Sequence, residues 1–105
     1  MQTQATHLCL MRLRFAEAFY DTFTDLLLAY TEKSLDFVAL PINRHHSQLQ
    51  TMNEQVSGYQ VGFEIQLKLS LAEVEALDQF LLAAVSRNSY ELLVSPLMEL
   101  SWRDA

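Results

Sequence analysis

The stretch VGFEIQLKLSLAEV, residues 61–74, contains the two local signals that decide the fold. In its first nine residues apolar and polar side chains alternate, a period-two pattern that predicts a β-strand with one buried face. The polar side of this strand consists of Glu64, Gln66 and Lys68. Ser70 then precedes Glu73 by three residues, the spacing of a capping box that starts a helix. The stretch therefore predicts a strand that passes directly into a helix.

The same two kinds of pattern occur on the N-terminal side of this stretch. Residues 8–15 alternate, which predicts a first strand with Arg12 and Arg14 on its polar side. Apolar residues then recur at helical spacing between residues 19 and 30. This change of period predicts a helix whose opposite side is acidic.

The helix that begins at Ser70 is expected to continue to Asn88, because asparagine tolerates the left-handed backbone conformation that ends many helices. Its buried stripe is expected to consist of Val74, Leu77, Leu81 and Val85. Residues 35–42 and 90–100 predict the two remaining strands. Each contains a proline, which cannot donate a hydrogen bond to a neighbouring strand. The first of them is therefore expected at a sheet edge or a bulge near Pro41, and the second at an edge.

The predicted order of elements is β-α-β-β-α-β within a single domain, residues 1–105, with residues 1–6 as a short disordered N-terminus. Two helices cannot cover both faces of four strands, so they are expected on one face, as in the α+β ferredoxin-like sandwich. First and third strands are then antiparallel neighbours, and arginine and glutamate can pair across them. The uncovered face is expected to be an oligomer interface, and its polar residues are Arg12, Arg14, Glu64, Gln66 and Lys68.

Composition excludes several classes of function. The formal net charge is −6 and the basic residues form no stripe, which argues against nucleic acid as a partner. No apolar run approaches the ~18 residues needed to span a bilayer. The polar start MQTQATH does not resemble a secretion signal, so we expect no membrane insertion and a cytoplasmic location. No nucleophile lies beside a base at a suggestive spacing, so we do not expect an enzyme.

The polar segment 43–60 holds the adjacent histidines His45 and His46. Imidazole is a good ligand for divalent transition metals, and one histidine per chain would converge with its copies in an oligomer. Glu54 could add a carboxylate. The alternative is an ordinary solvated loop, because two successive residues of an extended chain point in opposite directions. Leu49 and Met52 could contact a partner protein or fold back on the core, and Tyr59 is either a partner contact or a rim residue.

Three segments together resemble the PII-like proteins, and most closely a branch linked with heavy-metal efflux systems. They are EQVSGYQVGFEIQL (54–67), SLAEVEALDQFLLAAV (70–85) and YELLVSPLMEL (90–100), and the likeness extends over residues 8–100. The resemblance implies a non-enzymatic homotrimer that binds a small effector or metal ion between subunits. It also implies signalling through the 43–60 loop, with a membrane efflux transporter as a possible partner. The related CutA proteins, with the same fold, suggest the alternative of a metal-binding tolerance protein.

The chain departs from this family at the two places that hold phosphate in the nitrogen-signalling members. Those members have glycine at the end of the second strand and a glycine-rich basic turn before the fourth. Here the corresponding segments are INRHHS (42–47) and SRNSYE (86–91), which contain no glycine. The resemblance therefore leaves Arg44 and Arg87 as the candidate phosphate contacts, and it does not favour ATP.

Overall fold

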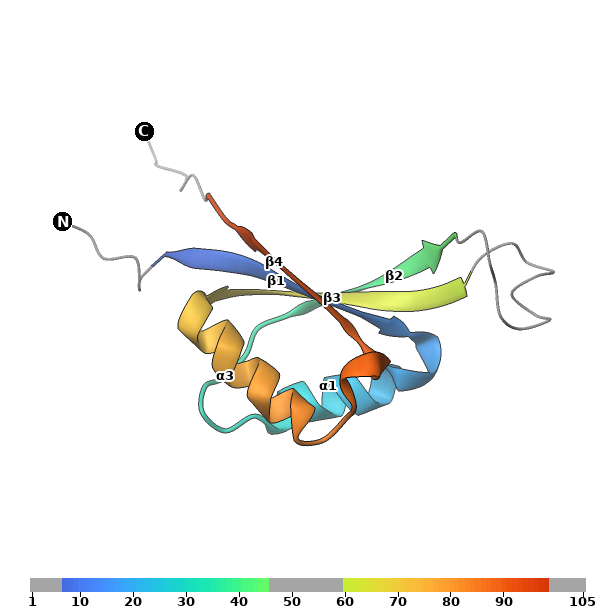
Figure 1. The fold of residues 1–105 in the computed structure, drawn as a ribbon, viewed down its shortest axis with the longest axis horizontal. Coiled ribbons are helices and arrows are strands. Elements are labelled where there is room, and N and C mark those ends of the chain that lie inside the picture. The colour runs from blue at the N-terminus through green and yellow to red at the C-terminus, as the bar shows by residue number, and fades with distance from the viewer. Residues whose placement is uncertain (1–6, 46–59, 99–105) are drawn as a thin grey trace.

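The computed structural model describes residues 7–45 and 60–98, which form a four-stranded antiparallel sheet with two helices on one face (Figure 1). The strand order is β2-β3-β1-β4, so the predicted α+β ferredoxin-like fold is confirmed. In chain order the elements are β1 (Leu8–Ala16), the 3₁₀ turn η2 (Glu17–Phe19), α1 (Tyr20–Ala29), β2 (Val38–Arg44), β3 (Gln60–Ser70), α3 (Leu71–Leu82), the 3₁₀ turn η3 (Arg87–Ser89) and β4 (Glu91–Pro96).

Both proline-containing strands lie at the edges of the sheet, as predicted. Their bounds differ from the sequence-based ones. β2 begins at Val38 rather than at residue 35, because its pairing with β3 starts where Val38 lies opposite Gln66. β4 ends at Pro96, opposite Cys9 near the start of β1, and the Leu97 amide still donates a hydrogen bond to the Leu8 carbonyl at 3.2 Å. Residues 99 and 100 of the predicted fourth strand lie outside the described residues, as do residues 1–6.

The core lies between the sheet and the two helices, and its residues come from the predicted apolar faces. The fully or nearly buried apolar side chains are Met11, Leu13, Phe15, Phe23, Leu27, Ile65, Leu67, Leu69, Val74, Leu77, Leu81 and Tyr90. Val85 is only half-buried at the margin of this cluster. Cys9 is half-buried and makes no disulfide within the described part of the chain.

The capping box predicted at the start of the second helix is present. The Ser70 hydroxyl accepts a hydrogen bond from the Glu73 amide at 3.2 Å, and the Glu73 carboxylate accepts one from the Ser70 amide at 2.9 Å. Caps of this kind are worth about 1 kcal/mol of stability. The cap fixes the point at which β3 becomes α3.

The predicted end of this helix at Asn88 was wrong. α3 ends at Leu82, and Asn88 lies in the separate turn η3. Two features prevent the helix from reaching Asn88. The backbone of Ser86 is extended, with φ −78° and ψ 154°. Arg87 then turns back to bond Asp78 on α3, which brings the chain over the helix toward β4.

The second face of the sheet has no helix over it. Leu40 and Val38 of β2 lie on this face, opposite Glu64 and Gln66 of β3. They are 40% and 55% exposed, respectively, and Leu8 of β1 is also exposed. The face therefore presents aliphatic side chains around a polar centre.

Candidate functional site

A pocket of about 650 Å³ lies at the end of the sheet where β1 and β2 finish and β3 and β4 start. Its lining combines residues far apart in the sequence, including Arg14, Ala16, Arg44, Gln60, Gly62, Arg87 and Glu91. Three of the seven lysine and arginine residues of an otherwise acidic chain line this one cavity. The pocket is therefore a place in the described structure where basic side chains are concentrated.

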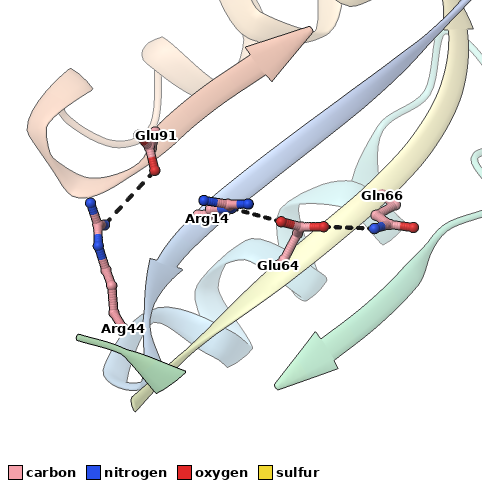
Figure 2. A network of polar contacts seen from close by, with 5 residues as sticks. All are labelled: Arg14, Arg44, Glu64, Gln66 and Glu91. Carbon is pink, nitrogen blue, oxygen red and sulfur yellow. Dashed lines mark hydrogen bonds and ion pairs between the residues drawn. The ribbon is translucent and has the colours of Figure 1, made fainter. Parts of the chain in front are cut away.

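Each of the three arginines faces a carboxylate. Arg14 Nε lies 2.6 Å from Glu64 Oε1, and Arg87 Nη2 lies 2.8 Å from Asp78 Oδ2. Arg44 Nη1 lies 3.8 Å from Glu91 Oε1, the longest of the three pairs. Figure 2 shows the first and the third of these pairs, at the end of the sheet. Because a guanidinium carries five N–H donors, each arginine keeps donors beyond those its pair uses.

Arg87 is held by a network on the helical side of the sheet. Its two terminal nitrogens donate to the two oxygens of Asp78, at 3.3 Å and 2.8 Å. The Tyr90 hydroxyl donates to the same carboxylate at 2.6 Å, and the Arg87 guanidinium carbon lies 5.3 Å from the centre of the Tyr90 ring. Burial, followed by the hydrogen bond to Asp78, raises the pKa of Tyr90 to about 12. The hydroxyl therefore stays a donor at neutral pH.

Glu64 is a buried carboxylate on the face that no helix covers. Its side chain is only 6% exposed. Its two oxygens accept hydrogen bonds of 2.6 Å from Arg14 Nε and from Gln66 Nε2 (Figure 2). Burial acts to raise the pKa of Glu64, but the bonds from Gln66 and Arg14 outweigh it and leave the pKa below its ordinary value. This confirms the predicted arginine–glutamate pairing between the first and third strands.

The lowered pKa of Glu64 predicts an acid-dependent loss of stability. The ionised carboxylate stabilises the fold above the unfolded-state pKa of about 4.3, and this contribution is lost as the pH falls through the lower folded-state pKa. Urea unfolding measured at steps from about pH 6 to about pH 3 should show a steeper loss for the natural protein than for Glu64→Gln. Glu75→Gln, at an exposed position of α3, controls for the loss of a carboxylate. Equal losses in the natural protein and Glu64→Gln would contradict this prediction.

Gly62, which lines the pocket, lies where β3 passes closest to the backbone of β1. A Cβ atom at this position would lie 2.5 Å from the carbonyl oxygen of Phe15, a contact that only a shift of backbone could relieve. Gly62 lies opposite Ala16 of β1 and Ile42 of β2. β1 and β3 therefore approach closely here, which only a residue without a Cβ atom permits.

The structure brings together only some of the residues named from the sequence. Arg44 and Arg87, named as candidate anion contacts, both line the pocket. His45 is exposed and is not part of the described lining. Within residues 7–45 and 60–98, no three His, Cys, Asp or Glu side chains lie close enough to share a metal ion. The other candidates in this segment lie outside the described residues: His46, Leu49, Met52, Glu54 and Tyr59.

Four residues of the site were not named as ligand contacts from the sequence. Arg14 was assigned only to the oligomer face, although it also lines the pocket. Glu91, Asp78 and Tyr90 were missed. The sequence does contain an indication of the role of Asp78. This residue falls within the buried stripe of α3, where an acidic side chain needs a hydrogen-bonding or charged partner. Arg12, Gln66 and Lys68 are not among the residues that line the pocket.

Comparison of the chain with protein-family models, with curated proteins and with solved structures gave no match. No helix in the described part of the chain is long and apolar enough to cross a membrane. Fold and pocket together define a small α+β domain with an arginine-lined pocket at one end of its sheet.

Proposed function

We propose that the protein is a non-enzymatic, PII-like regulatory or sensor protein that binds a small anionic effector in the arginine-lined pocket. The observation that carries this proposal is the convergence of Arg14, Arg44 and Arg87 on one cavity. They come from β1, β2 and η3, so only the folded chain creates the site.

The contacts around the arginines favour binding over catalysis. Glu64 and Asp78 hold two of the guanidiniums in place from outside the pocket lining. Side chains that are already ordered lose less conformational entropy when a ligand arrives. Guanidinium N–H groups match the oxygens of phosphates and carboxylates, often in pairs. The pocket thus has the donors that a small anion requires.

The resemblance to PII-like proteins agrees with the position of this site. It implies effector contacts from the end of the second strand and from the turn before the fourth. Arg44 is the last residue of β2, and Arg87 is the first residue of η3, immediately before β4. Arg44 is the second residue of the 43–60 segment and Gln60 is its last, and both line the pocket. In this proposal the protein is cytoplasmic and senses the effector where that segment joins the sheet. A membrane efflux transporter is its candidate partner.

Binding of pyrophosphate tests the anion site. We expect saturable changes in the amide resonances of pocket residues when pyrophosphate is titrated into the protein. Arg44→Ala and Arg87→Ala should each weaken binding by about tenfold or more, because each removes charge-assisted hydrogen bonds. Arg12→Ala is the matched control, since Arg12 lies on the same sheet but does not line the pocket. Failure of the natural protein to bind pyrophosphate or any phosphonate, or equal weakening by Arg12→Ala, would contradict the proposed site.

We also propose that the protein is a homotrimer assembled through the uncovered face of the sheet. The exposed aliphatic side chains Leu8, Val38 and Leu40 on that face support this proposal. Light scattering coupled to size exclusion should give three times the 12.1 kDa mass of one chain. Leu40→Asp should lower the measured mass, whereas Leu28→Asp on the helical side should not. A monomer at micromolar concentration would contradict the trimer.

A further inference from the structure

The pair between Arg44 and Glu91 differs from the other two pairs at the pocket. At 3.8 Å its closest atoms are too far apart for a hydrogen bond. The pairs made by Arg14 and Arg87 are hydrogen bonds of 2.6 Å and 2.8 Å. Glu91 Oε1 is shielded from water, yet no described residue donates a hydrogen bond to it. Such an oxygen is an unsatisfied group. The Glu91 side chain as a whole is 41% exposed and lines the pocket, so a ligand there can approach its carboxylate.

The same pair joins the two opposite edges of the sheet. Arg44 ends β2 and Glu91 begins β4, which are the outermost strands (Figure 2). The strands between them contribute five residues to the lining, of which Ala16 and Gly62 are small: Arg14, Phe15, Ala16, Gln60 and Gly62. A small molecule therefore has room beside this pair, with a cation on one side and an anion on the other.

The charge balance of the pocket limits which ligands can bind beside Arg44 and Glu91. Each arginine already faces one carboxylate, so the three pairs are neutral together. A plain anion beside Arg44 would leave its negative charge next to Glu91. A ligand with both an anionic group and an ammonium group would pair with both residues and leave the balance unchanged.

We propose that the pocket is selective for a small zwitterion whose anionic group binds Arg44 and whose ammonium group donates to Glu91. Compounds of this class include α-amino acids and aminophosphonates, which share the required chemistry. This inference rests on the proposed function, and it adds Glu91 as the residue that determines specificity.

Two probes of equal size test the role of the ammonium group. Aminomethylphosphonate and ethylphosphonate have the same number of non-hydrogen atoms and differ by an ammonium in place of a methyl group. We expect the natural protein to bind aminomethylphosphonate about tenfold more tightly in an amide-resonance titration, because a charge-assisted hydrogen bond to Glu91 is gained. Glycine and propionate form a second pair of the same kind and show whether carboxylate replaces phosphonate.

Substitution of Glu91 provides the specific test. Glu91→Leu should abolish the preference, so that the two phosphonates bind with equal affinity. Glu91→Gln, which keeps the shape of the side chain, should reduce the preference and guards against a folding defect. Glu75→Leu, at an exposed position of α3, should retain it. Equal binding of both phosphonates to the natural protein, or a preference that persists in Glu91→Leu, would overturn the zwitterion inference alone. No binding of either phosphonate or of pyrophosphate would overturn the anion site as well.

Discussion

Replacing Phe23 by alanine should lower the free energy of unfolding by about 3–5 kcal/mol, the usual cost of removing a buried phenyl ring. Phe23 is 0% exposed and contacts three other rings. It stacks on Phe15 with ring centroids 4.4 Å apart, and it meets Phe19 and Tyr90 edge-on at 6.3 Å and 5.4 Å. These contacts join α1 to β1, to η2 and to the start of β4. The cavity left by alanine would therefore weaken all of these junctions together.

Urea unfolding followed by circular dichroism measures this effect. Leu28→Ala is a control within the same helix, because Leu28 is 73% exposed and its substitution should change stability by less than about 0.5 kcal/mol. Since a small domain has only about 5–15 kcal/mol of stability, Phe23→Ala should populate the unfolded state well below the melting temperature of the natural protein. Similar losses for the two variants would show that the aromatic cluster does not organise the core.

Asp78→Ala should cost about 3 kcal/mol of stability, although Asp78 is an acidic residue on a helix. Its carboxylate accepts hydrogen bonds from both terminal nitrogens of Arg87 and from the Tyr90 hydroxyl. Alanine would leave that hydroxyl buried without a partner and would release Arg87 from its position in the pocket. We therefore expect weaker pyrophosphate binding as well as lower stability.

The double variant Asp78→Ala/Tyr90→Phe separates the two contributions. Removal of both partners of a buried hydrogen bond costs less than removal of one, because no unsatisfied group remains. The double variant should therefore be more stable than Asp78→Ala alone in urea, while its pyrophosphate binding stays weak because Arg87 is still released. A double variant less stable than Asp78→Ala would show that the unpaired hydroxyl is not the source of the loss.

The fold could be predicted from the sequence because its signals are local. The alternation in residues 61–69 and the Ser70 capping box each depend on neighbours within a few positions. The pairing of Arg14 with Glu64 followed once the order of the strands was known, since both residues lie on the polar side of adjacent strands. The end of α3 was missed because it depends on a bond between Arg87 and Asp78, which the helical pattern does not contain.

The pocket could be predicted only in part. Arg44 and Arg87 were named from the resemblance to PII-like proteins, but no local pattern indicates that Arg14 and Glu91 lie beside them. Arg44 and Glu91 are at opposite edges of the sheet, and their approach at 3.8 Å depends on how the folded strands bring the two side chains together. The burial of Glu64 on the uncovered face is likewise a property of the assembled sheet, because the bonds from Arg14 and Gln66 cover it.

The prolines on the two edge strands bear on how this domain avoids amyloid-like growth. Pro41 lies in β2 and Pro96 in β4, so each outer border of the sheet lacks one amide hydrogen. An incoming strand that aligned with either border would find a donor missing from the row that it needs for continuous pairing. Edge-to-edge pairing of copies of the chain into open-ended fibrils is thereby disfavoured. Association through the uncovered face of the sheet is not affected by these prolines.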